Sequence, residues 1–310
     1  VELPGGRLLC FALYRKSASD DRAQVDMWYS DDEAATWSLG GENLLPDGIA
    51  TTASTENGYT LNRCRAKLLN GAICLVIGGH VNGAISASGG TLGDQVWQYA
   101  SDNYGASFSL IEQWPIHVAD ADAIPGASPD LEVSGGFLIL AYLDSITSHG
   151  LIRRTGSAFV PFTYDTAKRM IPGIENEMTD TGSDPVYLLI GNVALWVDDD
   201  GALYGMSQLA TTGGKPIVMS VSRDHGQTWG ACGYNLAPSG GAEDVGNLIY
   251  FSDNDTYPVD FACTAQGGRS LVLCNREAAH SPASLDKTSL DCVYLGGFST
   301  VTMPSATAFS

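Results

Sequence analysis

Four acidic residues occur where they could act together on a substrate. Asp130 and Glu132 stand one residue apart in a run that begins at Pro129, so in a β-strand they would share a face. Asp260 has a similar place in a later run, and Asp20 follows an early one. Two carboxylates on either side of a sugar are the minimum for hydrolysis of a glycosidic bond. We therefore treat Asp20, Asp130 and Asp260 as candidate catalytic residues.

Basic residues supply the candidate substrate-binding groups. Arg63 and Arg65 flank Cys64, so strand alternation would point both to one side. Binding of a substrate and ion pairs that serve only the fold are equal alternatives for these two arginines. Arg276 and His280 follow a later apolar run, in a polar segment that could be a site or a solvated loop.

A two-residue turn recurs along the chain and indicates which elements would position these groups. Its second glycines are 65, 65, 65 and 67 residues apart. Such pairs supply the positive φ angles of tight hairpins. The copies are Gly5-Gly6, Asn70-Gly71, Gly135-Gly136, Asp200-Gly201 and Gly267-Gly268. This period predicts an all-β fold, a β-propeller of five blades with four antiparallel strands each, and a six-bladed form is the alternative.

The blade pattern assigns the innermost strands and the closure of the ring. Innermost strands are expected at 62–69, 129–133, 186–197 and 259–264, each just before a turn. The first turn has no such strand before it, and the segment 301–309 could fill that place. The sequence thus predicts one domain over residues 1–310, closed by its C-terminal strand, which would remove unpaired sheet edges.

A second motif, Ser-x-Asp-x-Gly-x-Thr-Trp, recurs in the segments between the two-residue turns. Its copies are 222–229, 30–37 and 101–108, with weaker echoes at 156–159 and 296–298. The pattern resembles the Asp box of sialidases and related BNR-repeat propellers. In those families the motif is structural and lies on the face opposite the site. An Asp side chain that accepts backbone N–H bonds and an aromatic ring packed in the core explain that role.

The resemblance to sialidases extends to the first strand. An apolar run ends at Arg15, and Asp20 follows five residues later. The resemblance implies that Arg15 contacts a sugar or its carboxylate and that Asp20 is the general acid/base. The chain departs from the family at Leu13, where an acid is expected, and at Thr302, where an arginine is expected. No Glu-Tyr nucleophile pair and no set of three arginines is apparent.

Two functions follow from this incomplete match. One is a glycoside hydrolase of sialidase-like fold that acts on a glycan. The other is a noncatalytic glycan-binding or structural propeller, for example a receptor-binding module of a virion or cell surface. Five-bladed arabinanase-type glycosidases use three acids from neighbouring innermost strands. The segments 183–186 and 196–201 resemble them faintly, although Asp-Pro and Asp-Asp-Gly are also common turn sequences.

The composition of the chain restricts which molecules and ions we expect it to bind. The net charge of −19 argues against nonspecific binding of nucleic acid and against anionic membranes, and no segment has the length and apolarity of a membrane span. No zinc-type spacing of His or Cys occurs, so we expect no cofactor, with calcium as the one possible ion. Seven cysteines cannot all pair within the chain, and Cys263 with Cys274 is the pair to examine. We expect an extracellular, virion or cell-surface protein and make no prediction of its oligomeric state.

Overall fold

The computed structural model describes strands and tight turns, and the described residues contain no helix. They fall into two compact units, residues 1–140, 144–146 and 154–163 in the first, and 141–143, 147–153 and 164–310 in the second. The described ranges are 1–15, 23–42, 44, 59–81, 94–115, 129–144, 149–169, 188–199, 201–210, 217–232, 260–266, 269–277 and 288–296.

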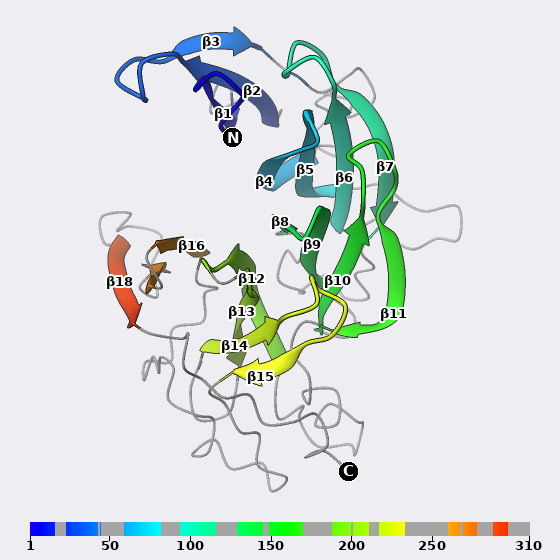
Figure 1. Ribbon diagram of the computed structural model, residues 1–310, viewed down its shortest axis with the longest axis vertical. Coiled ribbons are helices and arrows are strands. Elements are labelled where there is room, and N and C mark those ends of the chain that lie inside the picture. The colour runs from blue at the N-terminus through cyan, green and yellow to red at the C-terminus, as the bar shows by residue number, and fades with distance from the viewer. Residues whose placement is uncertain are drawn as a thin grey trace, which may run out of the picture. The chain divides into compact units, whose positions relative to one another are not determined.

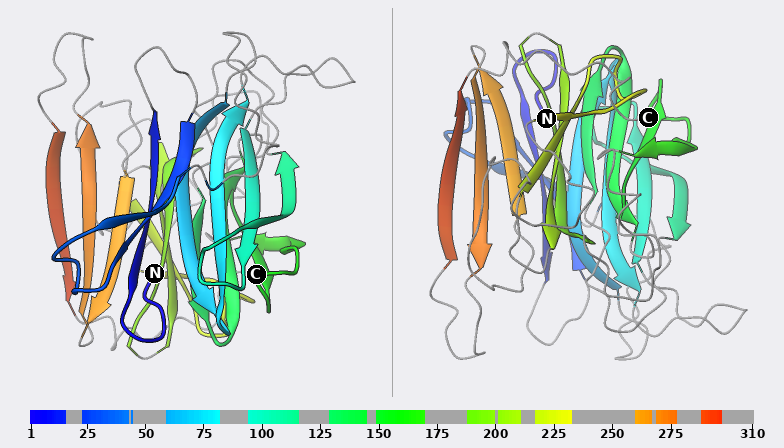
Figure 2. Two further views of the ribbon diagram at one scale, coloured as in Figure 1. Left: turned by 90° about the horizontal axis from the view of Figure 1, so that it is seen from above. Right: turned by 90° about the horizontal axis from the view of Figure 1, so that it is seen from below.

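The described strands form five sheets, and in each sheet the strands are neighbours in chain order (Figures 1 and 2). The first sheet contains β1 (Leu8–Arg15), β2 (Ala23–Ser30) and β3 (Ser38–Gly41). The second contains β4 (Tyr59–Leu69), β5 (Ala72–Val81), β6 (Asp94–Ser101) and β7 (Ser109–Pro115). The third contains β8 (Asp130–Ser134), β9 (Phe137–Asp144), β10 (His149–Thr155) and β11 (Thr163–Arg169).

The last two sheets continue the same pattern. The fourth contains β12 (Leu188–Val197), β13 (Leu203–Ala210), β14 (Ile217–Ser222) and β15 (Gly230–Cys232). The fifth contains β16 (Asp260–Gln266), β17 (Arg269–Glu277) and β18 (Thr288–Gly296). The all-β prediction is confirmed. Four strands are described in three of the sheets and three in the other two.

The periodic turns have the backbone geometry that their residue types predict. Both central residues have positive φ in Gly5-Gly6 (101° and 86°), Asn70-Gly71 (52° and 83°) and Gly135-Gly136 (56° and 79°). Gly201 has a φ of 80°, while Asp200 and the Gly267-Gly268 pair lie outside the described residues. Asparagine and glycine tolerate this left-handed region at low cost, which explains their recurrence there.

The N-terminal residues take part of the place of an innermost strand beside β1. Val1 donates its amino group to the carbonyl of Leu9 at 2.8 Å, and the Leu9 N–H donates to the Val1 carbonyl at 2.7 Å. Glu2 forms an antiparallel bridge with Leu8. The segment 301–309, expected at this edge, lies outside the described residues, so closure by the C-terminal strand stays a prediction.

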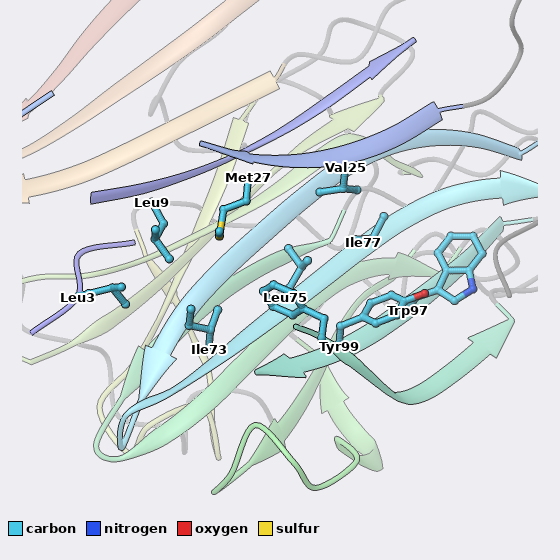
Figure 3. Close-up of a cluster of buried hydrophobic side chains, with 10 residues drawn as sticks. Leu3, Leu9, Val25, Met27, Ile73, Leu75, Ile77, Trp97 and Tyr99 are labelled. Atoms are coloured by element: carbon cyan, nitrogen blue, oxygen red, sulfur yellow. The ribbon is translucent and has the colours of Figure 1, made fainter. Parts of the chain in front are cut away.

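The core of the first unit lies between the first two sheets. Leu9, Val25 and Met27 of the first sheet point toward Ile73 and other apolar side chains of the second (Figure 3). These side chains are at least nine-tenths buried. Burial of one side chain of this size stabilises the folded state by about 1.5–3 kcal/mol. This cluster is therefore the main apolar contact between the two sheets.

Among the described residues, the second motif forms four hydrogen-bonded turns, which we call the repeated turns. They lie at residues 30–37, 101–108, 155–162 and 222–229. In the first, the Ser30 hydroxyl donates to Asp32 Oδ1 at 2.7 Å, and the Ala34 N–H donates to Ser30 Oγ at 2.9 Å. Asp32 accepts both the backbone N–H (2.8 Å) and the hydroxyl (2.6 Å) of Thr36. These bonds lower the pKa of Asp32 to about 2, because they stabilise the charged carboxylate.

The second repeated turn uses an amide for the same purpose. Asn103 Oδ1 accepts from the Ser107 N–H at 3.0 Å, while Asn103 Nδ2 donates to the Ser107 hydroxyl at 2.8 Å. The turn at 222–229 again has an aspartate at this position. Asp224 accepts hydrogen bonds from the Thr228 N–H (2.8 Å) and from the Thr228 hydroxyl (2.6 Å). Partial burial raises the pKa of Asp224, but the hydrogen bonds from Thr228, Ser222 and Gln227 outweigh it and lower the value.

The fourth repeated turn corrects the sequence assignment. The echo predicted at 156–159 placed Phe159 at the aromatic position, but Phe159 is 41% exposed and Phe162 is 2% exposed. Phe162 follows Ser157 by five residues, as Trp37 follows Asp32, so it is the aromatic of this turn. The predicted burial of the aromatic was also wrong for Trp37, which is 40% exposed. Of the echo at 296–298, only Gly296 is described.

Within the first unit, two repeated turns pack against the sheet that precedes them. A Cβ added to Gly105 would lie 2.6 Å from Met27 Sδ, and the ring of Phe108 meets that of Phe11 edge-on at 5.9 Å between centroids. The turn at 155–162 is held to β6 by Gln98, whose Nε2 donates to the Ala158 and Val160 carbonyls, both at 3.0 Å.

The strand register argues against a hairpin disulfide in the fifth sheet. Val272 stands opposite Cys263, and Phe261 stands opposite Cys274. The two cysteines are therefore offset by two residues rather than directly paired, a separation larger than a disulfide normally spans. Among the described residues, Cys10, Cys64 and Cys74 are free thiols.

Gly105→Ala is expected to destabilise the first unit by about 1–2 kcal/mol, because Gly105 has a φ of 90° that an alanine adopts at a cost. The new methyl group would also displace Met27. The matched control is Ala34→Gly at the same position of the first repeated turn, where Ala34 is exposed with a φ of 69°. That change should be neutral or slightly stabilising. Equal losses in urea unfolding of the two variants would contradict this account of the turns.

Acid should weaken the repeated turns as the pH falls from about 4 toward 2. The pKa of Asp32 and that of Asp224 are lowered in the folded chain, so the stability they add is present above their unfolded pKa and is lost as they protonate. An Asp32→Asn/Asp224→Asn variant should unfold with a weaker pH dependence in that range, because Asn103 already forms such a turn with an amide. Circular dichroism of urea unfolding at several pH values measures this. An unchanged pH dependence would contradict it.

Candidate functional site

Two ion pairs join β4 and β8, the innermost strands of the second and third sheets. Arg65 Nε lies 2.8 Å from Asp130 Oδ1, and Lys67 Nζ lies 2.8 Å from Glu132 Oε2. In both pairs the partners are 65 residues apart, the period of the turns. Equivalent positions of successive repeats therefore carry opposite charges and bind each other. We call these residues, together with Arg63, the charged face of β4 and β8.

Strand alternation separates this charged face from the apolar core. Cys64, Ala66 and Leu68 of β4 pack against the core between the first two sheets. The residues between them, Arg65 and Lys67, reach β8 instead. Arg63 precedes Cys64 and by the same alternation belongs to the charged face. The face thus includes the first residue of β8, Asp130, and the second half of β4, where Arg65 and Lys67 lie.

The charged face is more buried at Asp130 than at its partner. The side chain of Asp130 is 9% exposed and that of Arg65 is 33% exposed, while Lys67 and Glu132 are 36% and 15% exposed. Arg63 is 5% exposed. A buried carboxylate needs a charged partner, and loss of that partner costs more than loss of a surface ion pair. Arg65 is therefore one group that holds Asp130 in place.

The structure brings together three of the eight candidate site residues, namely Arg63, Arg65 and Asp130. Ion pairing, one of the two alternatives for the arginines, is what the structure shows for Arg65. Lys67 was not identified from the sequence, although its 65-residue offset from Glu132 was a signal that could have revealed the pair.

The other five candidates are described only in part or lie outside the described residues. Arg15 ends β1 opposite Ala23. In the fifth sheet, Asp260 begins β16 opposite Asn275, and Arg276 of β17 stands opposite Ser289. For these three only the backbone is described. Asp20 and His280 lie outside the described residues, and the roles of all five stay predictions.

The thiols near the charged face are not suited to nucleophilic catalysis. Burial raises the pKa of the Cys64 thiol to about 11, despite the neighbouring Arg65 guanidinium. Complete burial likewise raises the pKa of the Cys74 thiol. Since the thiolate is the reactive form, both cysteines are unreactive near neutral pH.

Neither a clustered metal site nor a membrane-spanning helix is found in the described ranges. There, no group of three or more His, Cys, Asp or Glu side chains is arranged to hold an ion. The same ranges contain no helix long and apolar enough to cross a membrane.

Comparisons with known proteins identify the fold. No family model matches the sequence, and no curated protein matches it either. A protein of unknown function from Dyadobacter fermentans is similar in structure, with a TM-score of 0.56 and 10% identity over 98% of this chain and 79% of that one. An α-L-arabinofuranosidase from Fusarium graminearum, solved with an iminosugar inhibitor, has a TM-score of 0.51 and 12% identity over 96% and 91% of the two chains.

An α-L-arabinanase from Penicillium chrysogenum, solved with arabinobiose, has a TM-score of 0.50 and 12% identity, again over 96% and 91%. At this identity the likeness establishes fold alone, and that fold is the β-propeller of such glycosidases. The blade number and the specific kinship with sialidases stay predictions.

Arg65→Met should destabilise the first unit by about 2 kcal/mol, because it leaves the Asp130 carboxylate buried without this partner. An Arg65→Met/Asp130→Leu variant should regain most of the loss, since the buried Asp130 carboxylate is removed together with Arg65. Lys67→Met is the matched control, and it should cost less, because Lys67 and Glu132 are both more exposed than Asp130. Urea unfolding measures all three. A double variant as unstable as Arg65→Met would contradict this view of the charged face.

Proposed function

We propose that this chain is a glycan-acting enzyme, a glycoside hydrolase whose site lies at the charged face of β4 and β8. The fold supports the proposal, since the Fusarium and Penicillium propellers of similar structure are an α-L-arabinofuranosidase and an α-L-arabinanase. The proposal assigns Asp130 as a catalytic carboxylate, with Arg65 as the residue that positions it and Arg63 beside it as a substrate-binding group.

The observation that carries the proposal is the state of Asp130. It starts an innermost strand, its side chain is nine-tenths buried, and the Arg65 guanidinium holds it at 2.8 Å. A carboxylate fixed in this way is suited to act as the nucleophile or the base of glycoside hydrolysis, because preorganisation lowers the cost of reaching the transition state.

Hydrolysis needs a second carboxylate, and Asp20, which belongs to the same unit as Asp130, is our candidate. The spacing of the two would set the stereochemical outcome, with about 5–5.5 Å for retention and about 6.5–9.5 Å for inversion. One of the two would act as the acid that protonates the leaving oxygen. Such a mechanism requires no cofactor, and Arg15 of the same unit is its further candidate sugar contact. The roles of Asp260, Arg276 and His280, which belong to the second unit, stay predictions from the sequence.

We favour an arabinose-containing glycan over a sialoside as the substrate. The Penicillium arabinanase is bound to arabinobiose, and the chain departs from the sialidase pattern at Leu13 and Thr302. A polymeric glycan would be met outside the cell, so an extracellular or surface location fits this function. The acidic chain is suited to a neutral polymer, which its charge would not repel.

A noncatalytic glycan-binding propeller is the second candidate. One observation favours it, since both acids of the charged face, Asp130 and Glu132, are held in ion pairs that also join two strands. In this case the charged face would be a structural element, and a sugar would bind without turnover. The two candidates differ in whether loss of one carboxylate removes turnover or only affinity.

Asp130→Asn tests the proposal. With arabino-oligosaccharides as substrates, we expect kcat to fall by about 10²–10⁴-fold, as for loss of a catalytic acid or base, while the dissociation constant changes little. Glu132→Gln is the matched control, because it breaks the other ion pair of the same face, and it should keep kcat within a few-fold. Asp20→Asn tests the second carboxylate, Asp260→Asn tests the role that the sequence predicts for that residue, and a sialoside panel tests the sialidase alternative.

Each outcome of this panel has a clear meaning. Turnover that survives in Asp130→Asn would remove that residue from the mechanism. Binding of a glycan without any turnover by the unmodified chain would favour the noncatalytic module. Equal loss of turnover in Glu132→Gln would show that the charged face acts through the fold.

A further inference from the structure

The hairpin between β4 and β5 ends in an asparagine followed by a glycine, a pair whose neighbouring groups can react with each other. Asn70 and Gly71 form the two-residue turn, and both are exposed to solvent. Both have positive φ, 52° and 83°, and nothing lies within 4 Å of a Cβ added to Gly71. The Asn70 side-chain amide and the Gly71 nitrogen are therefore close along the chain, at a tip that water reaches.

The Gly71 nitrogen lies beyond the hydrogen-bonded ladder of this hairpin. Leu69 and Ala72 are the last residues that pair across it, so Asn70 and Gly71 can rotate while the strands stay paired. Glycine has no side chain to oppose that rotation. The reaction requires it, because the Gly71 nitrogen has to approach Asn70 Cγ. Such an opening is inexpensive, since exposed turns with few buried contacts are the parts of a fold that open most readily.

Asn103, in the second repeated turn, shows the opposite arrangement. Its side-chain amide is held at both ends, since Oδ1 accepts from the Ser107 N–H at 3.0 Å and Nδ2 donates to the Ser107 hydroxyl at 2.8 Å. The next residue is Tyr104, and a side chain at that position hinders attack by its own backbone nitrogen. The structure therefore holds Asn103 away from this reaction and leaves Asn70 open to it.

We propose that Asn70 is a site of spontaneous deamidation. The Gly71 nitrogen loses its proton to base and bonds to Asn70 Cγ, the Cγ–Nδ2 bond breaks, and Nδ2 takes up a proton and leaves as ammonia. The resulting succinimide ring adds one water molecule. Cleavage of one of its carbon–nitrogen bonds gives aspartate, and cleavage of the other gives isoaspartate. The reaction needs no oxidant, reductant or cofactor, and it does not depend on the proposed function.

The two products differ in their effect on the turn. Aspartate already stands at the equivalent position of the Asp200-Gly201 turn, so the fold should tolerate it. Isoaspartate adds one methylene group to the main chain, and the geometry of a two-residue hairpin turn does not accommodate it. The end of β4 would then lose its pairing with β5. Lys67, which binds Glu132, lies only three residues before the turn, so isoaspartate should loosen the charged face from this end.

Ageing of the full chain at mildly alkaline pH, followed by peptide mapping, tests the proposal. Mass spectrometry should show loss of the amide at Asn70, with isoaspartate among the products, while Asn103 keeps its amide. Asn70→Gly is the matched variant, because Gly5-Gly6 and Gly135-Gly136 form turns of this kind with two positive φ angles. Hydrogen exchange of residues 66–75 should become faster with age in the unmodified chain and should stay unchanged in Asn70→Gly.

Fragmentation of the peptides assigns each reacting residue. This matters because two other Asn-Gly pairs, at 57–58 and 82–83, lie outside the described residues. An Asn70 amide that stays intact in the aged folded chain, while the chain unfolded in urea loses it, would overturn the proposal, since the folded turn would then be protected. Equal conversion of Asn70 and Asn103, or the same change of exchange with age in Asn70→Gly, would also overturn it.

Discussion

The ion pair between Arg65 and Asp130 is the contact on which the rest of the account depends. It joins the innermost strands of two successive sheets, and it fixes a carboxylate at the first residue of one of them. The buried end of the pair cannot be left alone, because an isolated buried charge is far more costly than a paired one. The strands are therefore held in a register that keeps Asp130 and Arg63 on the same face.

Two different kinds of contact hold the neighbouring sheets of the first unit. Apolar side chains fill the space between the first and second sheets, whereas charged pairs join the second and third at their innermost strands. Farther along the sheets, the repeated turns pack against the sheet before them through Gly105 and Gln98. Burial of apolar side chains thus supplies most of the free energy that holds these sheets together. The polar contacts specify how the neighbouring strands are aligned.

The sequence predicted the fold well, because backbone geometry leaves local signals. Asn-Gly and Gly-Gly pairs report positive φ directly, and the strands before them were placed within a few residues, as for 62–69 against Tyr59–Leu69. The errors concern tertiary contacts. Phe159 was chosen over Phe162 because burial depends on a neighbouring sheet that the local pattern does not show. The offset of Cys263 from Cys274 depends on strand register in the same way.

The candidate site was predictable in its residues but not in their partners. Alternation put Arg63 and Arg65 on one side and Asp130 and Glu132 on one side, yet no local pattern states that the two sets meet across two strands. The separation of 65 residues between Arg65 and Asp130 would have indicated that they meet. The same separation also pairs Lys67 with Glu132. The 65-residue repeat thus contained this information. To use it, one has to know that the innermost strands of successive sheets are neighbours.

A crystal structure of the Asp130→Asn variant with a bound arabino-oligosaccharide tests the central claim most directly. Our account predicts a sugar within hydrogen-bonding distance of residue 130 and Arg63, with the glycosidic oxygen facing the start of β8. A sugar bound only elsewhere, for example at the repeated turns, would contradict it.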